Sequence, residues 1–245
     1  MKKTIRFVFV LLFCSGLILL VGVGNCGRIT REETRKIEKR AEGMIQTLKN
    51  YGITDSKVLE AMKKVRRHEF IPLAYRDLRT AYGDHPWNIG HGQTISQPYI
   101  VAYMTEKMAP QPGEKILEIG TGSGYQAAIL AEMNAIVYSI EIIKPLAEHA
   151  KSVLDEHGYN VKVKHGDGYK GWPEHAPFDV IIVTCAPENI PQALIDQLNI
   201  GGRMIIPVGA VHSVQSLIIV RKTSEGIRME NDLAVRFVPM VTGEK

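Results

Sequence analysis

Three glycines alternate along the loop that follows the apolar segment KILEI: Gly120, Gly122 and Gly124. Glycine lets the backbone turn sharply and lets a ligand approach the N-terminus of the next helix. A dinucleotide fingerprint would need another glycine where the sequence has Tyr125. Glu118, just before the loop, suits a cation and repels a phosphate. The loop therefore favours a cationic nucleoside over a pyrophosphate, with a purely structural tight turn as the alternative.

Two further acids follow the next two apolar segments. Glu141 stands 21 residues after Gly120, where an acid accepts hydrogen bonds from both hydroxyls of a ribose. Asp167, followed by Gly168, is placed to accept a hydrogen bond from an adenine amino group. A single acid at a strand end is usually a solvated loop residue, but three on successive strands indicate a nucleoside-binding crevice. S-adenosylmethionine fits best, because it has no phosphate and carries a sulfonium and an ammonium group.

Apolar runs alternate with helical patterns from residue 97 onward. We expect helices at 97–109, from Ser123, at 144–158 and at 189–198, and strands at 115–120, 135–141, 161–166, 178–184 and 203–209. This alternation predicts an α/β fold, a mostly parallel twisted sheet with helices on both faces. The last two apolar segments, SVQSLIIVRK and EGIRMENDLAVRFVPM, have no helix between them and predict an antiparallel strand pair.

Two helices are expected before this unit. Residues 29–50 are charge-rich with apolar positions at helical spacing, and Asp55 is placed to cap a second helix, SKVLEAMKKV. Residues 66–95 are rich in glycine and proline and predict an irregular segment, which inside a compact domain is more often functional than idle. No linker divides residues 29–245, so we expect a single domain.

Residues 1–28 carry a separate signal. The basic residues 1–6 precede the uncharged apolar run 7–24, the layout of an export signal, and this run also reaches the lower length limit of a spanning helix. Cys26 follows at a place where a lipidated cysteine would stand, although Asn25 replaces the small residue expected before it. A cleaved signal, a membrane anchor, lipidation and a start codon placed too far upstream all stay open.

Composition narrows the function classes. With 45% hydrophobic and 23% charged residues among 245, the chain is neither disordered throughout nor a polytopic membrane protein. Lys2, Lys3 and Arg6 supply three of the four net positive charges, so the near-neutral remainder does not favour binding to nucleic acid. The three cysteines are too scattered for a disulfide framework or a zinc cluster, and we expect no metal.

Specific motifs extend over most of the chain. Residues 81–98 give A-Y-x-D-x-P-x-x-I-G-x-G-Q-T-I-S-Q-P, followed by LEIGTGSGYQ, GDG, FDVIIVTCAP, GGRMIIPVG and VRFVP. On these motifs the chain closely resembles the protein-L-isoaspartate O-methyltransferases over about residues 45–243. The resemblance implies the Rossmann-like fold of class I S-adenosylmethionine-dependent methyltransferases. The Q-T-I-S-Q-P element is highly specific, whereas the glycine loop alone would indicate only the class.

The resemblance also implies an activity. Family members transfer a methyl group from S-adenosylmethionine to the free α-carboxylate of L-isoaspartyl residues, and less readily to D-aspartyl residues, in damaged proteins. The methyl ester re-forms a succinimide, whose hydrolysis returns some normal aspartate. These enzymes are usually cytoplasmic monomers, so residues 1–28 depart from the family pattern. Membrane association through residues 7–24, or export, is therefore the competing expectation for location.

The resemblance also implies which residues of this sequence form the site, by matching their positions to the family motifs. The family's active-site hydroxyl matches Ser96, within a substrate-binding subregion at residues 29–96. The expected cofactor-binding residues are Thr94, Ile95, Glu118, Gly120, Gly122, Gly124, Glu141, Asp167 and Gly168. The expected substrate-binding residues are Thr94, Ile95, Arg236, Phe237 and Val238, the last three in a strand that the resemblance assigns to the damaged peptide.

The chemistry needs little from the protein beyond placement. A carboxylate with a reference pKa of about 4 is ionised at pH 7, so a strong general base is unnecessary. A neutral hydroxyl such as that of Ser96 can orient the carboxylate without neutralising it. Ser96 and Thr94 also precede an expected helix, so an N-cap role is an alternative that can coexist with catalysis.

Two other functions compete with protein repair. One is a methyltransferase of the same fold acting on a small molecule or RNA, of which RNA is disfavoured by the near-neutral body. The other is a membrane-tethered module that binds S-adenosylmethionine without turnover. An isoaspartyl peptide tested against its normal aspartyl counterpart separates these interpretations.

Overall fold

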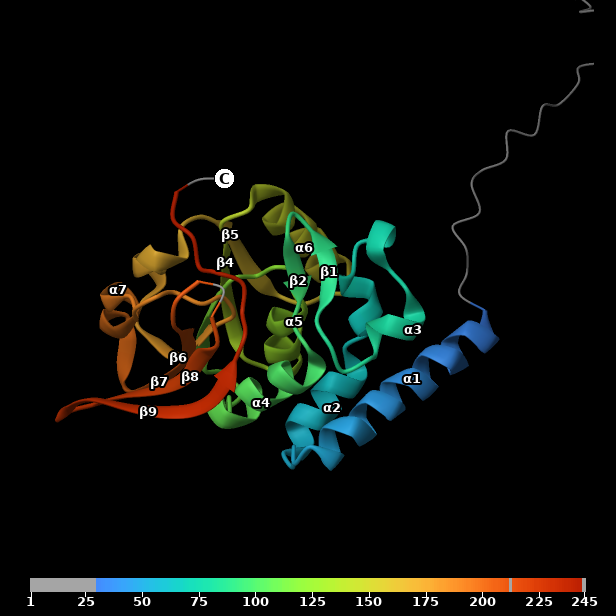
Figure 1. The fold of residues 1–245 in the computed structure, drawn as a ribbon, viewed down its shortest axis with the longest axis horizontal. Coiled ribbons are helices and arrows are strands. Elements are labelled where there is room, and N and C mark those ends of the chain that lie inside the picture. Colours follow the sequence, from blue (N-terminus) through green and yellow to red (C-terminus); the bar gives the residue numbers. More distant parts are fainter. Residues whose placement is uncertain (1–29, 212, 244–245) are drawn as a thin grey trace, which may run out of the picture.

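The computed structural model describes residues 30–211 and 213–243, which build a central sheet flanked by helices (Figure 1). The helices are α1 Arg31–Asn50, α2 Ser56–Lys64, α3 Leu78–Ala81, α4 Pro98–Met108, α5 Tyr125–Glu132, α6 Lys144–Glu156 and α7 Gln192–Asp196. The strands are β1 Trp87–Gly90, β2 Gln93–Ile95, β3 Lys115–Ile119, β4 Ile136–Glu141, β5 Val161–His165, β6 Phe178–Val183, β7 Leu198–Val208, β8 Gln215–Thr223 and β9 Gly226–Val235. Short 3-10 helices are η1 Arg67–Phe70, η2 Leu73–Tyr75, η3 Gly168–Lys170 and η4 Pro173–His175.

The main sheet has seven strands in the order β5-β4-β3-β6-β7-β8-β9. Strands β3 to β7 are parallel, and β8 is antiparallel to both β7 and β9. The chain builds outward from β3 through β4 to β5 and then returns to place β6 on the other side of β3. This reversal creates a switch point at the carboxyl ends of β3 and β6, where open α/β sheets bind ligands. The predicted sheet and its antiparallel C-terminal pair are confirmed.

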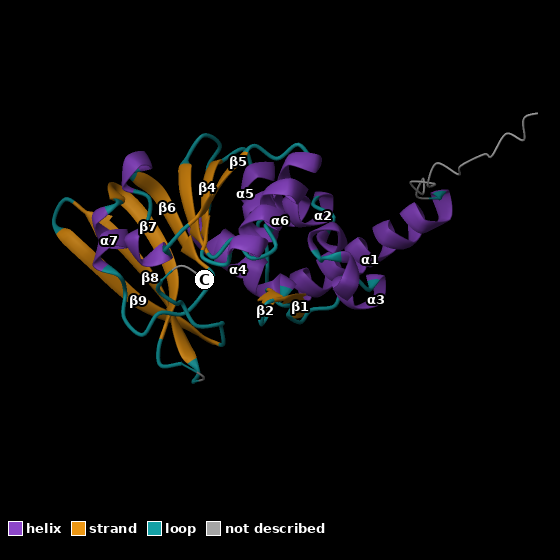
Figure 2. Cartoon of the chain, turned by 90° about the horizontal axis from the view of Figure 1, so that it is seen from above, coloured by secondary structure: helices purple, strands orange, loops and turns teal. Residues whose placement is uncertain are grey.

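Buried side chains form one cluster on each face of the sheet. The larger cluster takes residues from α1, α2, α4, α5 and α6, which gather on one side in Figure 2. The smaller cluster lies under α7 and includes Leu117, Ile181 and Leu194. The two layers explain why the central strands are apolar on both faces rather than alternating.

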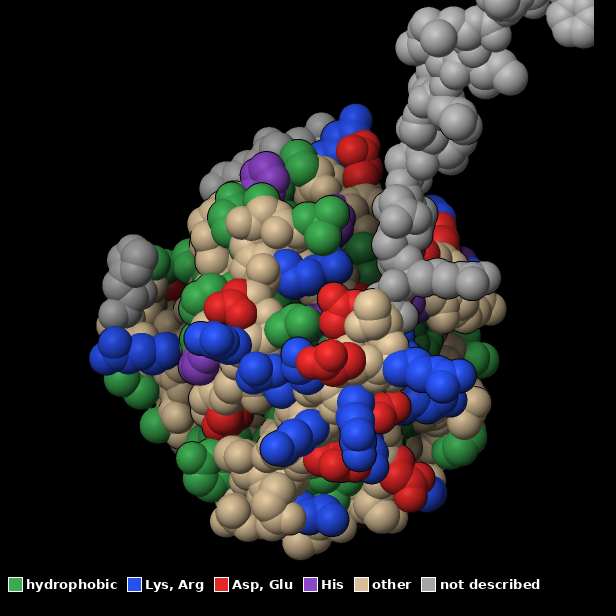
Figure 3. Space-filling model, turned by 90° about the vertical axis from the view of Figure 1, so that its right-hand side faces the viewer, with side chains coloured by type: hydrophobic (Ala, Val, Ile, Leu, Met, Phe, Trp, Pro, Cys, Tyr) green, Lys and Arg blue, Asp and Glu red, His purple; other side chains and the backbone are tan. Residues whose placement is uncertain are grey.

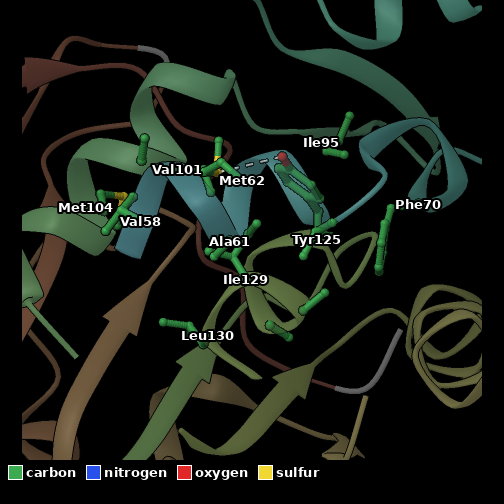
Figure 4. Close-up of a cluster of buried hydrophobic side chains, with 14 of the residues drawn as sticks. Val58, Ala61, Met62, Phe70, Ile95, Val101, Met104, Tyr125, Ile129 and Leu130 are labelled. Atoms are coloured by element: carbon green, nitrogen blue, oxygen red, sulfur yellow. Dashed lines mark hydrogen bonds between the residues drawn. The ribbon is translucent and has the colours of Figure 1, made fainter. Parts of the chain in front are cut away.

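The N-terminal helices share the larger core. Val58, Ala61 and Met62 of α2 face α4 and α5, and the hydroxyl of Tyr125 at the start of α5 donates to the sulfur of Met62 at 3.7 Å (Figure 4). Asp55 caps α2 as expected, accepting from the backbone N–H groups of residues 57 and 58. The subregion before the sheet is therefore packed directly against the helix that follows the glycine loop.

The irregular segment 66–95 is made of short elements ending in the β1–β2 hairpin, in which Trp87 pairs with Ile95. The fully buried Arg67 anchors it. The Nε of Arg67 donates to the carbonyl of Ala81 at 2.8 Å, and its guanidinium lies 4.9 Å from the ring centre of Tyr125. Burial lowers the pKa of Arg67 to about 10. One side chain thus joins the hairpin segment to α5.

Several boundaries differ from the expectations, and the largest difference is at the start of β7, which begins at Leu198 rather than at residue 203. The predicted helix 189–198 was wrong in extent, because α7 covers only Gln192–Asp196. Proline disfavours helical backbone in the residue before it, and Pro191 is the N-cap of α7. Helix α5 begins at Tyr125 rather than Ser123, because the N-cap Gly124 has a left-handed backbone with φ of +86°.

The face covered by α1 carries both signs of charge. Basic and acidic side chains are interspersed there (Figure 3). Within α1, Lys36 pairs with Glu32 at 2.6 Å, and Glu42 of α1 pairs with Lys63 of α2 at 3.4 Å. Such mixing gives no single-sign surface of the kind that binds a phosphate backbone.

The expectations for residues 1–28 fall outside the described part of the chain. Between Thr30 and Gly243, leaving out residue 212, no described helix combines the length and the apolar character needed to cross a membrane.

Candidate active site

A cavity opens at the carboxyl ends of β3, β4 and β6, beside the start of α4 and the segment after β9. Of the expected site residues, those lining it are Thr94, Ile95, Ser96, Glu118, Gly120, Gly122, Glu141, Gly168, Phe237 and Val238. Gly124, Asp167 and Arg236 do not line this cavity. Residues far apart in the sequence thus meet at the switch point of the sheet.

The glycine loop passes close to the end of β6, which leaves no room for a side chain at Gly120. Gly120 has φ of +94°, a conformation that side chains disfavour. A Cβ added there would lie 2.6 Å from the hydroxyl oxygen of Thr184, just beyond β6. Gly124 approaches α6 instead, where a Cβ added to it would lie 3.3 Å from the side chain of Leu154. Gly120 therefore shapes the cavity, while Gly124 allows close packing of α5 on α6.

Glu118 lies at the end of β3 and is fully buried. The hydroxyl of Ser139 donates to its Oε2, while Oε1 has no hydrogen-bond partner in the described residues. Burial raises the pKa of Glu118 to about 8; the Ser139 hydrogen bond opposes this rise, and the nearby carboxylate of Glu141 adds to it. Burial therefore favours the protonated form of Glu118, and a nearby positive charge would favour the ionised form.

Glu141 ties the glycine loop to the end of β4. Its Oε2 accepts from the N–H of Gly122 at 2.7 Å, and its Oε1 accepts from the N–H of Ile143 at 2.9 Å. Each carboxylate oxygen has a second lone pair, so both can accept a further hydrogen bond. The same side chain can then order the loop and receive a diol.

Asp167 stands at the rim rather than in the cavity. Its Oδ1 accepts from the N–H of Tyr169 at 2.9 Å and caps the 3-10 helix η3. The following Gly168 is buried against Ile119, where a Cβ would overlap the isoleucine side chain. The backbone of Gly168 therefore forms part of the cavity wall.

Ser96 does not cap α4. The N-cap of α4 is Gln97, whose side chain makes no capping bond. Asp84 supplies the cap from the preceding loop, because its Oδ1 accepts from the N–H of Tyr99 and its Oδ2 from the side-chain amide of Gln97, both at 2.8 Å. The half-buried hydroxyl of Ser96 is left with no hydrogen-bond partner among the described residues.

A second groove adjoins the cavity. The two share Thr94, Ser96, Ile100, Thr184, Phe237 and Val238. Arg236 lines this groove although it does not line the cavity. Ser96 thus lies on a wall common to a deep cavity and an outer groove.

The segment after β9 is held in place by its backbone. The N–H of Ala186 donates to the carbonyl of Val238 at 2.8 Å, and the N–H of Met240 donates to the carbonyl of Ala186 at 2.8 Å. The N–H of Phe237 donates to the side chain of Gln215 at 2.9 Å. These bonds fix the wall on which Phe237 and Val238 lie.

Thr184 is a site residue that the sequence analysis missed. It lines both the cavity and the groove, and its hydroxyl donates to the carbonyl of Gly120 at 2.6 Å. The signal was present in FDVIIVT, since Thr184 is the last residue of the fourth predicted strand, at the same edge of the sheet as the three acids.

The sheet order, the glycine loop at its switch point and the acids at the strand ends define a class I S-adenosylmethionine-dependent methyltransferase. The family model described as protein-L-isoaspartate(D-aspartate) O-methyltransferase matches residues 39–245. The chain belongs to this family, and it is an S-adenosylmethionine-dependent protein carboxyl O-methyltransferase.

Individual relatives agree with this assignment. The chain is 55% identical over 201 residues to a protein-L-isoaspartate O-methyltransferase of Gloeobacter violaceus, covering 82% of this chain and 97% of the relative. It is 50% identical over 230 residues to a protein of the same name from Opitutus terrae, and this match covers 94% of this chain and 96% of the relative. A solved structure from Plasmodium falciparum is described as a protein-L-isoaspartate O-methyltransferase in complex with S-adenosyl-L-homocysteine. It is 27% identical to this chain with a TM-score of 0.73, and the match covers 83% of this chain and 99% of that one.

Proposed function

We propose that the cavity binds S-adenosylmethionine and the adjoining groove binds a damaged protein, so that a methyl group passes to the free α-carboxylate of an L-isoaspartyl residue. D-aspartyl residues are the less favoured substrates. The ester starts repair, because it closes to a succinimide that hydrolyses in part to normal aspartate. One observation carries the proposal: the hydroxyl of Ser96, which makes no hydrogen bond to the described residues, stands on the wall that cavity and groove share.

The residues of the cavity fit the cofactor. When bound, S-adenosylmethionine supplies a methyl group activated by a sulfonium. The Oε1 of Glu118, unpartnered among the described residues, is a buried acceptor suited to a cationic group. Glu141 retains acceptor capacity for ribose hydroxyls, and Asp167 retains its second oxygen for an amino group at the rim. Thr94, Ile95, Gly120, Gly122 and Gly168 close the wall around them, while Gly124 supports the loop from behind.

Ser96 acts by placement. Its hydroxyl donates a hydrogen bond to one oxygen of the incoming carboxylate and leaves the other oxygen to attack. Because the hydroxyl is neutral, the carboxylate keeps its charge. The apolar neighbours Ile95 and Phe237 exclude water, which makes the anion more reactive than in solution.

The substrate lies along the groove. Residues Arg236, Phe237 and Val238 line this groove, and so does Thr94 of β2. Ile95, expected with Thr94 to bind the substrate, lines the cavity and not the groove. The hydrogen bonds to Gln215 and Ala186 keep Phe237 and Val238 in place, which limits the ordering cost when a flexible damaged segment binds. Residues 29–96 are in this proposal the substrate-binding part of a single domain that spans residues 29–245.

Location has two competing proposals. The family resemblance favours the cytoplasm, whereas the apolar run 7–24 favours a membrane anchor or export. Mass analysis of the natural N-terminal peptide distinguishes an intact, cleaved or lipidated segment from one that is never translated.

The activity is tested with labelled S-adenosylmethionine and two peptides that differ only in an isoaspartyl or a normal aspartyl linkage. We expect labelling of the isoaspartyl peptide alone, and loss of turnover in Ser96→Ala with cofactor binding retained. Equal labelling of both peptides, or of neither, rejects the repair function. Tight binding without any turnover would instead support a sensing module.

A further inference from the structure

The groove beside Ser96 carries a single charged side chain. Its walls are otherwise apolar or neutral, with Pro86, Ile100 and Val214 among them, and Arg236 is the only charged residue among the described residues that line it. A peptide lying in this groove therefore meets one positive charge and no negative one from the described residues.

The position of Arg236 is set by its neighbours. Val235 before it is buried at the end of β9, and Phe237 after it is bonded through its N–H to Gln215, itself buried. The backbone on both sides is thus fixed, while the Arg236 side chain is exposed at the point where the chain leaves the sheet. The guanidinium of Arg236 therefore extends from a backbone that is held in place on both sides.

Two acids are already engaged: Asp84, which contacts the groove residue Gln97, and Asp232, two residues before the groove residue Ala234. Asp84 accepts from Tyr99 and Gln97, and Asp232 accepts from the hydroxyl of Tyr103 at 2.9 Å and from Lys107 at 3.2 Å. Within residues 30–211 and 213–243, Arg236 makes neither an ion pair nor a side-chain hydrogen bond. Its charge is therefore available to a ligand.

We propose that Arg236 is a specificity-determining residue that favours isoaspartyl sites with an acidic residue close by in the sequence. A guanidinium presents a planar fork of donors that matches a carboxylate. This inference rests on the proposed function, because it assumes that the groove holds the substrate peptide. It assigns Arg236 to a neighbouring side chain and leaves the reacting α-carboxylate to Ser96.

The test compares isoaspartyl peptides that carry Glu, Gln or Lys at one position, moved in turn over the two residues before and the two after the damaged residue. At the position nearest Arg236, we expect the KM of the native enzyme to be about three- to fivefold lower for Glu than for Gln, and highest for Lys. Arg236→Gln should abolish the difference, and Arg236→Glu should reverse the order. Added salt should weaken the preference, because the pair is exposed.

Arg221→Gln provides the matched control, since Arg221 is exposed on β8 and lines neither the cavity nor the groove. It should keep the native order of peptides. The proposal is overturned if Arg236→Glu leaves that order unchanged, or if it lowers kcat equally for every peptide, which would assign Arg236 to the reacting carboxylate. Failure of the native enzyme to label any isoaspartyl peptide is a different result and would reject the proposed function itself.

Discussion

The hydroxyl of Thr184 lies 2.6 Å from the carbonyl oxygen of Gly120 and donates a hydrogen bond to it. The hydroxyl oxygen of Thr184 would also lie 2.6 Å from a Cβ at position 120. The residues that follow β3 and β6 are thus in direct contact where they line the cavity. The contact requires glycine on one side and a short hydroxyl on the other.

Gly120→Ala should weaken both folding and cofactor binding. The added methyl group collides with Thr184, and the positive φ costs about 1–3 kcal/mol. Calorimetric titration with S-adenosylhomocysteine should show an affinity at least tenfold lower. The double variant with Thr184→Ala removes the collision but keeps the backbone strain, so it should recover only part of the loss. Native affinity in the single variant would contradict the close contact.

Ser96→Ala should lower kcat by about 10- to 100-fold, the range for losing one hydrogen bond to a charged group. The melting temperature should stay close to native, because the hydroxyl makes no bond within the described chain. Binding of S-adenosylhomocysteine should also be retained. A large loss of stability with normal kcat would instead indicate a structural role.

Cofactor affinity should depend on pH through Glu118. The raised pKa of about 8 means that the free protein holds a proton there at pH 7, and a bound cation favours the ionised form. Binding below pH 8 therefore releases a proton, and affinity should rise by up to about tenfold per pH unit before levelling above pH 8. Titrations in two buffers with different ionisation enthalpies measure the released proton directly.

Glu118→Gln is the control for this dependence. It should bind more weakly and release no proton, so that its affinity becomes nearly flat between about pH 6 and 7, below the range in which the ammonium group of the ligand itself titrates. Glu141 faces the same cavity and stays in place in this variant. An unchanged slope would therefore assign the proton to a group other than Glu118.

Asp84→Ala should destabilise the start of α4 and displace Ser96. The variant loses the acceptors for Tyr99 and Gln97, and the loss of such a cap costs about 0.5–2 kcal/mol in the free energy of unfolding. Denaturant unfolding measures this cost, and kcat should fall in parallel. Asp84→Asn keeps one acceptor for Tyr99 and should recover most of the stability. Native stability in Asp84→Ala would show that another group caps the helix.

Periodicity made the sheet predictable, because each central strand is a short apolar run bounded by a turn. Ligands bind at the carboxyl ends of parallel strands, and this rule predicted that Glu118 and Glu141 lie in one cavity. Both residues line it. The helix predicted at 189–198 exists but starts later than expected for a local reason, since Pro191 is its N-cap. Local sequence therefore predicted elements better than their ends.

The finer features of the site depend on tertiary contacts that spacing does not reveal. Asp84 caps the helix that begins at Pro98, which freed Ser96 from the role that its position suggested. The raised pKa of Glu118 follows from complete burial, and burial is a property of the assembled layers. Thr184 matters through Gly120, which lies 64 residues earlier in the chain.

The wall common to cavity and groove has a thermodynamic consequence. Since Ser96, Thr184 and Phe237 face both compartments, a molecule in one alters the surface offered to the other. Any gain in peptide affinity caused by the methyl donor must be matched by an equal gain in donor affinity caused by the peptide. Whatever coupling this shared wall transmits is therefore equal in the two directions.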